Sequence, residues 1–259
     1  MPNNQYVTRR LRRKEGGMSN IANRRRVMGK GEKRFELIYH WEAIDYHYGD
    51  LYWIDRIKGL KLVKYNMPEP TEDGMVKVGV NDPNYNSYSY FRMNMNESGF
   101  TLGSEWKAQV TFKTGTPGNT RIIDIIDFGS VTSAGHAFLL GLSGSTMKTE
   151  FNAKLTGNNS GPLYGVTLDK TFQPNIIHTL AYGVEKYDDV NNIPYGETAG
   201  EKKYAENTLE RWKAYFGTER DYGSWNTPIM LVGWCNAAPA YQNNCPIFIK
   251  NIKIYKDRL

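Results

Sequence analysis

The stretch W-K-A-Q-V-T-F-K (Trp106–Lys113) decides the fold of this chain. Its Trp, Ala, Val and Phe fall at every second position, and Lys, Gln, Thr and Lys fill the positions between them. This period of two is typical of a β-strand with one face in a core and the other toward solvent. The stretch therefore predicts a half-buried strand.

Apolar runs of strand length lie on both sides of this stretch, separated by turns rich in Gly, Asn and Pro. They are Phe35–Ile44, Asp50–Asp55, Tyr85–Met95, Arg121–Phe128, Gly135–Leu142, Lys148–Leu155, Leu163–Leu168, Ile176–Val184, Pro228–Gly233 and Pro246–Tyr255. Short strands at a spacing of roughly ten residues are typical of antiparallel sandwiches and jelly rolls. The sequence predicts an all-β, antiparallel β-sandwich jelly roll over residues 35–259.

One segment, residues 197–217, departs from the strand pattern. Thr198 and Glu201 have the spacing of a capping box, and apolar residues follow at helical steps up to Phe216, before Gly217. We expect one inserted amphipathic helix there. The alternative is a strand at Leu209–Phe216.

A basic arm precedes the predicted sandwich. The first 34 residues contain eleven Lys and Arg against two acids, whereas the whole chain carries only +6. The arm has little apolar content, so we expect it to dock on an acidic partner rather than to fold alone. A disordered tail is the alternative. Its main basic residues are Arg9, Arg10, Arg12, Arg13, Lys14, Arg24, Arg25 and Arg26.

Several classes of protein are disfavoured by composition. No stretch approaches the roughly 20 apolar residues of a membrane span, so we expect no membrane association. The two cysteines, Cys235 and Cys245, have no zinc-site spacing. We favour two free thiols over a single disulfide, and the sequence leaves that choice open.

The end of the chain resembles a known family. The last predicted strand ends in K-N-I-K-I-Y (Lys250–Tyr255), similar to the closing strand of laminin-G-like and concanavalin A-type lectin and glucanase jelly rolls. Trp53-Ile-Asp55 loosely resembles the W-x-D-x-x-G opening of the same modules, with its glycine one residue late, at Gly59. The resemblance covers about residues 40–259 and implies the concanavalin A-like fold more than a function.

The arm adds a second resemblance. A basic N-R-R-R-x-M stretch (Asn23–Met28) joined to such a jelly roll is similar to structural proteins of tailed bacteriophages and prophages of gut bacteria. That resemblance implies localisation in a virion, other virion proteins (capsid, neck or fibre) as partners, and a homo-oligomer. Nucleic acid is the less favoured partner, because the arm lacks the interleaved aromatics of single-strand binders.

The strand Arg121–Phe128 invites a catalytic interpretation. Glucanases of this fold carry E-x-D-x-x-E, and this chain has Ile122, Asp124 and Asp127 at those positions, so the first acid is missing. Asp124 and Asp127 are three apart and share a face only if the strand contains a bulge. We therefore expect no catalytic residues and no enzyme activity.

Metal and glycan sites are the remaining candidates. Asp188, Asp189 and Asn191 cluster oxygen atoms on a predicted loop that could bind Ca²⁺, although a solvated loop is the favoured interpretation; otherwise we expect no cofactor. Aromatic and amide side chains in turn-rich sequence are typical of sugar recognition, unless the tryptophans merely pack beneath the loops. These glycan candidates are Tyr222, Trp225, Asn226, Trp234, Tyr241, Gln242 and Asn243.

The sequence thus predicts a non-enzymatic virion protein. In this hypothesis the basic arm docks on the particle, and the jelly roll is presented as a capsid decoration, head fibre or adhesion module that binds host-surface or mucosal glycans. The alternatives are a glucanase-type hydrolase and a free carbohydrate-binding module.

Overall fold

A computed structural model gives the fold of the chain. It describes residues 35–79, 81–82, 87–100, 102, 105–116, 122–130, 136–143, 146–154, 163–188, 191–206, 209–210, 228–233 and 245–257. The chain divides into two units, Met1–Arg34 and Phe35–Leu259, and every described residue belongs to the second. The predicted docking arm, with all of its basic residues, lies outside the described residues.

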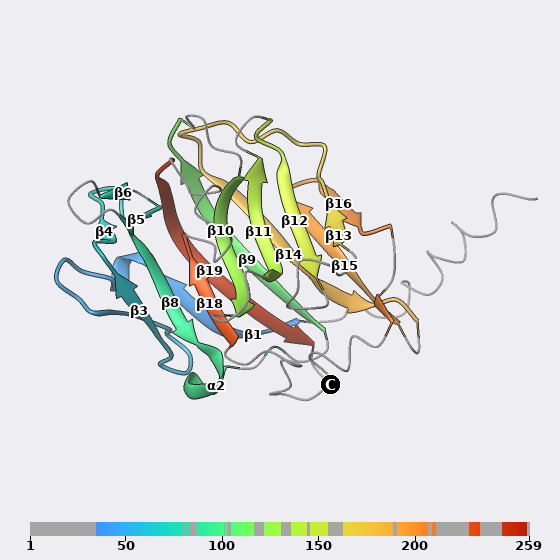
Figure 1. Ribbon diagram of the computed structural model, residues 1–259, viewed down its shortest axis with the longest axis horizontal. Helices are drawn as coiled ribbons and strands as arrows, with labels where there is room; N and C mark the ends of the chain where they lie inside the picture. Colours follow the sequence, from blue (N-terminus) through green and yellow to red (C-terminus); the bar gives the residue numbers. More distant parts are fainter. Residues whose placement is uncertain are drawn as a thin grey trace, which may run out of the picture. The chain divides into compact units, whose positions relative to one another are not determined.

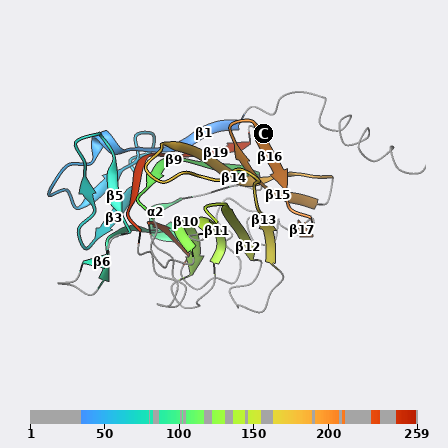
Figure 2. The ribbon, with the colours of Figure 1, turned by 90° about the horizontal axis from the view of Figure 1, so that it is seen from above.

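Two antiparallel sheets form the described part and stack as the two layers of a sandwich (Figures 1 and 2). The nine-stranded sheet has the order β16-β15-β14-β9-β19-β5-β4, with β1 paired to β19 and β17 paired to β15. Its strands are β1 (Phe35–Glu42), β4 (Glu69–Pro70), β5 (Val76–Val78), β9 (Trp106–Thr114), β14 (His178–Lys186), β15 (Asn191–Thr198), β16 (Glu201–Tyr204), β17 (Leu209–Glu210) and β19 (Ile247–Asp257).

The second layer is an eight-stranded sheet with the order β13-β12-β11-β10-β18-β8-β3-β2. Its strands are β2 (Tyr52–Ile54), β3 (Lys61–Tyr65), β8 (Tyr90–Asn94), β10 (Ile122–Ser130), β11 (His136–Ser143), β12 (Thr149–Lys154), β13 (Leu163–Val166) and β18 (Pro228–Val232). A small hairpin, β6 (Asn81–Asp82) with β7 (Ser87–Tyr88), stands apart from both sheets. The described helical structure is the four-residue α2 (Met95–Ser98) and the 3₁₀ turn η1 (Ala43–Asp45), and no described helix is long and apolar enough to span a bilayer.

The core lies between the two sheets, as the alternating pattern of Trp106–Lys113 predicts. Trp106, Ala108, Val110 and Phe112 of β9 are all fully buried, and the residues between them are partly exposed. The Trp106 ring contacts Phe128 of the opposite sheet edge-on, with 5.8 Å between ring centroids. The predicted all-β jelly-roll sandwich is therefore confirmed.

The last strand occupies the middle of the nine-stranded sheet. β19 pairs with β9 along its length, with β5 at its start and with β1 at its end. Ile252 and Ile254 enter the core, as the alternation at the end of the sequence predicts. The predicted role of this strand in closing the sandwich is confirmed, and it joins the first described strand to the rest of the sheet.

The predicted helix at 197–217 is wrong where the structure describes it. Glu201–Tyr204 is strand β16 and Leu209–Glu210 is strand β17, whereas residues 211–217 lie outside the described part. Thr198 pairs with Glu201 across a tight hairpin turn in which Gly200 has φ +83°, a conformation suited to glycine.

The side chains of the apparent capping box bind elsewhere. The Glu201 carboxylate accepts hydrogen bonds from the backbone N–H groups of Asp169 (2.6 Å) and Lys170 (3.1 Å). The Thr198 hydroxyl donates to the carbonyl oxygen of Thr179 at 2.9 Å. The capping-box spacing is thus used for a hairpin, because both side chains satisfy backbone groups of neighbouring segments.

Candidate functional site

Most residues predicted for a site lie where the structure gives no description. All seven glycan candidates fall outside the described residues: Tyr222, Trp225, Asn226, Trp234, Tyr241, Gln242 and Asn243. That site stays a prediction. The described surface offers a different candidate.

The three residues of the candidate calcium site, Asp188, Asp189 and Asn191, do not all lie in one loop. Asn191 is the first residue of β15, where it pairs with Glu210, and Asp189 lies outside the described residues. Within the described part, no three His, Cys, Asp or Glu side chains are grouped so that they could hold a metal ion.

The outer face of the eight-stranded sheet carries an aromatic surface at the β2–β3–β8 end. Leu62 of β3 and Phe91 of β8 point into the core, so the residues that alternate with them point outward. Pairing sets Tyr52 opposite Val63, Val63 opposite Arg92 and Tyr65 opposite Tyr90. We call these five residues the tyrosine platform: Tyr52, Val63, Tyr65, Tyr90 and Arg92.

The rings of the tyrosine platform are ordered against one another. Tyr65 and Tyr90 stack, with ring centroids 4.8 Å apart and an angle of 3° between the ring planes. The Arg92 guanidinium lies 6.0 Å from the centroid of Tyr65, and Lys61 Nζ lies 5.0 Å from that of Tyr52. Burial and the neighbouring Tyr65 raise the pKa of Tyr90, and the Arg92 charge opposes this shift. The platform thus combines a stacked tyrosine pair, a third tyrosine and Arg92, with Lys61 beside it.

Exposure distinguishes this surface from other aromatic clusters. Tyr52 and Tyr65 are 39% and 37% exposed, although both belong to strands. Tyr195, on the outer face of the nine-stranded sheet, is also in a strand but is fully buried. Exposed apolar strand residues that gather on one face are typical of binding surfaces.

The platform is supported from beneath by the core. Trp53 of β2 is fully buried, and its ring lies 5.3 Å from that of Phe91 of β8. Tyr46 contacts the same Phe91 ring edge-on at 5.1 Å. Because the inward residues of β2 and β8 are packed together, the outward residues of these strands are held in register.

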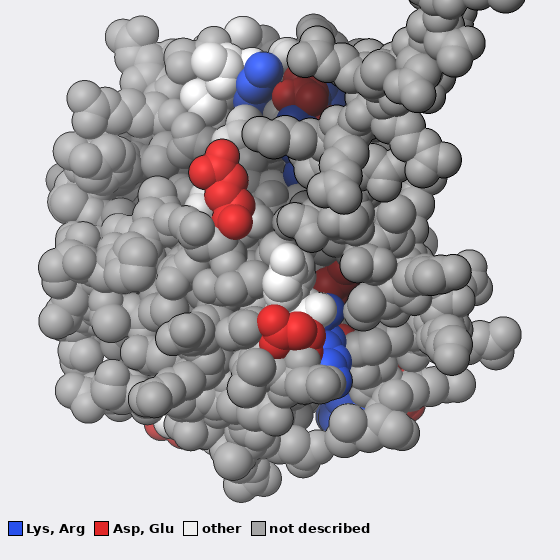
Figure 3. Space-filling model, turned by 90° about the vertical axis from the view of Figure 1, so that its right-hand side faces the viewer, with Lys and Arg blue, Asp and Glu red and all other residues white. Residues whose placement is uncertain are grey.

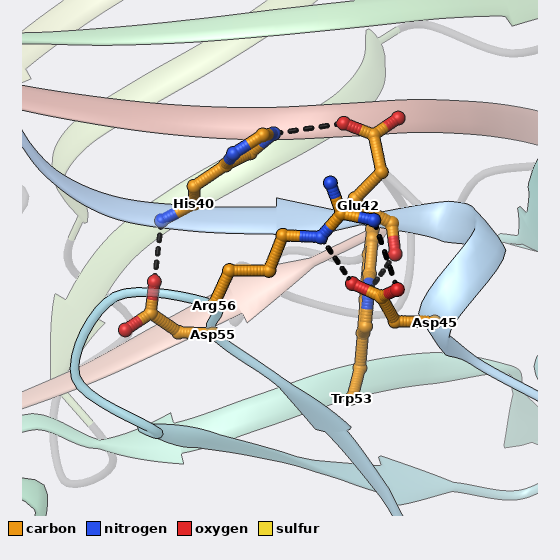
Figure 4. Close-up of polar contacts among 6 residues, drawn as sticks. All are labelled: His40, Glu42, Asp45, Trp53, Asp55 and Arg56. Carbon is orange, nitrogen blue, oxygen red and sulfur yellow. Dashed lines mark hydrogen bonds and ion pairs between the residues drawn. The ribbon is translucent and has the colours of Figure 1, made fainter.

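Asp55 fastens the β2–β3 hairpin to β1 (Figure 4). Its carboxylate is buried and accepts hydrogen bonds from the backbone N–H groups of His40 in β1 and of Lys58, the latter at 2.6 Å. The Arg56 N–H donates to the His40 carbonyl oxygen at 2.9 Å. Gly59 follows with φ +72°, and its N–H donates to the Asp55 carbonyl oxygen. The late glycine of the W-x-D motif therefore still closes this turn.

Further polar contacts surround this attachment, and Figure 4 shows them on both sides of β1. The Trp53 indole donates to the Glu42 carbonyl oxygen at 2.9 Å, and the His40 Nε2 atom lies 2.8 Å from the Glu42 carboxylate. Arg56 forms two hydrogen bonds with Asp45, which lower the pKa of that carboxyl. These contacts anchor the hairpin that carries Tyr52 and Tyr65.

Asp124 and Asp127 share a face of β10. The pairing with β11 passes from Asp124–Gly141 to Ile126–Leu140, which is the bulge that a shared face requires. Ile125 and Ile126 both enter the core, so Asp124 and Asp127 both point to the outer face of the eight-stranded sheet. Both carboxylates are buried and make interactions within the protein. Asp124 and Asp127 thus form a buried pair on one face of β10. The first acid of the glucanase pattern E-x-D-x-x-E is still missing, because Ile122 occupies its position.

The outer face of the nine-stranded sheet has charges of mixed sign. The Glu185 carboxylate accepts a hydrogen bond from the Tyr204 hydroxyl and pairs with Lys202 at 2.8 Å. Lys203 pairs with Asp169 at 2.7 Å. Figure 3 likewise shows described acidic and basic side chains beside one another on the side it views. Such surfaces neutralise themselves and offer little attraction for a charged ligand.

The sequence could not have singled out the tyrosine platform. Its members come from three separate strands, and only the register brings Tyr65 beside Tyr90 and Val63 beside Arg92. The usable signal was the alternation in Y-F-R-M-N (Tyr90–Asn94) and K-L-V-K-Y (Lys61–Tyr65), where tyrosines occupy the solvent-facing positions.

Comparison with known proteins identifies the fold and no family. No family model matches the chain, and no curated protein sequence is significantly similar to it. Solved structures do match. One, described as "Cell entry of botulinum neurotoxin type C is dependent upon interaction with two ganglioside molecules", has a TM-score of 0.53 and 13% identity, over 92% of this chain and 50% of that chain.

Two other structures give a similar result. The "Binding domain of Botulinum neurotoxin DC in complex with rat synaptotagmin II" has a TM-score of 0.50 and 12% identity, over 86% of this chain and 49% of that chain. Alginate lyase A1-II′, of polysaccharide lyase family-7, has a TM-score of 0.48 and 10% identity, over 75% of this chain and 86% of that chain. The chain spans about half the length of the two neurotoxin chains. Such low identities show the sandwich fold alone.

Proposed function

We propose that this chain is a non-enzymatic, glycan-binding jelly-roll protein of a tailed-phage particle. The observation that carries the glycan-binding part is the tyrosine platform, in which the exposed Tyr52 of β2 and Tyr65 of β3 share one face with the partly buried Tyr90 of β8 and with two cations. Sugars stack their apolar faces on such rings.

The architecture supports this proposal. The platform lies on strands rather than loops, and its hairpin is fastened to β1 through Asp55. A rigid surface loses little conformational entropy when a ligand binds, which favours affinity for a flexible oligosaccharide. The neurotoxin structure described by its interaction with gangliosides has the same sandwich architecture, although that interaction belongs to the neurotoxin.

The basic arm supplies the particle-docking part of the proposal. Residues 1–34 hold a strong excess of positive charge, whereas the rest of the chain does not. Such an arm is attracted to an acidic lattice of virion proteins and can order on binding. In this arrangement the arm faces the particle, and the sandwich, as a homo-oligomer, is presented to host-surface or mucosal glycans.

The glycan-binding part is tested by a glycan array followed by titration calorimetry with the best ligand. Tyr65→Ala should weaken binding about two- to tenfold, because a ring that stacks on a ligand contributes about 0.5–1.5 kcal/mol. Tyr187→Ala is the matched control, because Tyr187 has the same 37% exposure but directly follows β14 of the other sheet. Equal affinities for wild type and Tyr65→Ala would remove the platform from the proposal.

The docking part is tested separately by co-sedimentation with emptied phage capsids. The full chain should sediment with the capsids, and the chain without residues 1–34 should stay in solution while keeping its β-rich circular dichroism spectrum. A truncated chain that still sediments would refute docking through the arm and leave the glycan-binding part untouched.

A second candidate function is glycan hydrolysis at Asp124 and Asp127. It is favoured by one observation, the bulge in β10 that turns both buried carboxylates to the same face. Retaining and inverting glycosidases both work with a pair of carboxylates. Reducing-end release that is lost in Asp127→Asn would establish this function, and its absence in the wild type is what our proposal expects.

A further inference from the structure

The three strands that carry the tyrosine platform contain positive charges and no acids. Strands β2, β3 and β8 contain no Asp or Glu, and their outward-facing charged residues are Lys61 and Arg92. Across the sheet, Arg92 of β8 pairs with Leu231 of β18, and Leu231 pairs with Asp127 of β10. Asp127 is the nearest acid in this row of paired residues, and it is fully buried. The platform therefore carries uncompensated positive charge among the described residues.

The two cations differ from Lys113 and Lys202, which also lie over aromatic rings. Lys113 lies 5.0 Å from the Phe248 centroid and is also bound to Asp73, and Lys202 lies over Tyr195 and is also bound to Glu185. Among the described residues, neither Lys61 nor Arg92 has an ion pair with an acid, so no described carboxylate competes with a ligand for either cation.

Both cations can reach one ligand. Arg92 lies directly opposite Val63, and Lys61 is two residues before Val63 on the same strand, so the two are diagonal neighbours. Diagonal neighbours on one face of a sheet are about 7–8 Å apart. This is within the span of a single sugar ring and its substituents, given the length of Lys and Arg side chains. The stacked rings of Tyr65 and Tyr90 lie beside Arg92 in the same pair of strands.

We propose that the tyrosine platform selects carboxylated sugars, such as hexuronates or sialic acids, over neutral ones. This inference rests on the proposed glycan binding and names the ligand class for that same surface. The sugar ring stacks on the tyrosines, and its carboxylate is bound by the Arg92 guanidinium, whose fork of N–H donors matches a carboxylate, with Lys61 adding a second charge. The aromatic rings keep both cations at the edge of the surface through cation–π attraction.

The test compares ligands that differ only in charge, with the full-length protein. Titration with the galacturonic acid trimer and with its methyl ester isolates the carboxylate, because esterification leaves the ring unchanged. At low salt the acid should bind about tenfold tighter than the ester, and the difference should shrink at high salt as screening grows. Sialyllactose and lactose form a second pair, and a sulfated oligosaccharide is the third probe.

Substitutions then assign the preference to the two cations. Arg92→Gln and Lys61→Gln should each weaken binding of the acid more than binding of the ester and so bring the acid-to-ester affinity ratio toward one. Tyr65→Ala should weaken both ligands together. Lys107→Gln is the matched control, because Lys107 lies 4.9 Å from the Tyr255 ring on the nine-stranded sheet and its loss changes the net charge by the same amount.

The outcomes separate the two ideas. If no glycan binds the wild type, the proposed function fails and this inference fails with it. If glycans bind but the acid and the ester bind equally, or if the ratio is unchanged in Arg92→Gln and Lys61→Gln, only the inference fails. Binding of the sulfated probe without the carboxylated ones also overturns it. Because the salt dependence is measured on the wild type, the result does not depend on the folding of any variant.

Discussion

At the scale of single residues, Asp55 connects three segments of the chain. One carboxylate oxygen binds the backbone of β1 at His40, and the other binds the turn at Lys58. Trp53, two residues earlier, is fully buried and donates to Glu42. The motif that the sequence shows as W-I-D is thus the attachment point of the hairpin that carries the platform.

Removal of this attachment should destabilise the protein. Asp55→Ala leaves two backbone N–H groups without their acceptor, and each buried unsatisfied donor costs about 1–3 kcal/mol. Chemical denaturation should show a loss of that order in the free energy of unfolding. Asp50→Ala is the control, because Asp50 accepts a hydrogen bond from His47 at an exposed position. A loss no larger than that of the control would mean that Asp55 is not an anchor.

The sequence could suggest that Asp55 matters but not how. The W-x-D spacing of Trp53 and Asp55 is visible in the sequence. His40, whose backbone N–H donates to the Asp55 carboxylate, is 15 residues away and is brought near only by the fold. The same limit applies to the platform, whose tyrosines are ordinary strand residues until the register is known.

At the scale of elements, the contact between β9 and β14 depends on one glycine. A Cβ atom at Gly183 would overlap the Trp106 carbonyl oxygen and come within 3.0 Å of Lys107 Cα. Both of these are backbone atoms, which cannot move without disturbing the pairing of the two strands. Gly183 is required for this close approach.

Gly183→Ala should therefore be destabilising by about 1–3 kcal/mol, the usual cost of forcing atoms into a packed region. Gly196→Ala in the neighbouring β15 is the control, because its Cβ would meet flexible side chains, with Val166 at 3.4 Å. Thermal unfolding of both variants measures the difference. Equal melting temperatures would show that β9 and β14 adjust to the extra methyl group.

Elements also show where sequence patterns mislead. The alternation in β9 was decisive because Trp106–Lys113 has no competing helical period, and the strand is found at Trp106–Thr114. The segment from Thr198 to Phe216 has spacings that suit both a helix and a hairpin. Tertiary partners at Thr179, Asp169 and Lys170 favour the hairpin, and no local rule could reveal them.

At the scale of the whole molecule, buried tyrosines should make the protein sensitive to alkali. Burial raises the pKa of Tyr46 to about 12, and burial together with the charges of Asp127 and Glu185 raises the pKa of Tyr182 and Tyr195 further. An unfolded tyrosine ionises near pH 10, at about its ordinary pKa. The folded protein thus holds protons that the unfolded chain releases.

The sign of the pH dependence follows from this difference. The stabilisation is fully present below about pH 10 and is lost as the pH rises toward 12 and beyond, because the unfolded chain then binds fewer protons. Denaturation midpoints should therefore fall steadily across this range, and Tyr46→Phe should make the fall less steep. Tyr48→Phe, at an exposed tyrosine, should not. Midpoints that stay level to about pH 12 would contradict the expectation.

The overall architecture could be predicted from the sequence more fully than any site. Ten apolar runs and their turns were enough to predict a jelly roll. The alternation of buried and exposed residues can be seen within each strand, without knowing its neighbours. The start of β15 was predicted to be a loop, because its first two residues, Asn191 and Asn192, are polar and typical of loops. Sites depend on which strands become neighbours, and that is a property of the assembled sheets.

The position of β19 has a consequence for how the chain is made. Ile247–Asp257 fills the middle of a sheet, between β9 on one side and β1 and β5 on the other, yet it is the last of the described strands to leave the ribosome. Until it emerges, β1 and β9 are left with open edges that can pair with the same strands of a neighbouring nascent chain. A polysome crowded with unfinished copies would favour such mispairing. Slow translation of the codons for β19 should therefore lower the yield of soluble protein more than slow translation of the codons for β1.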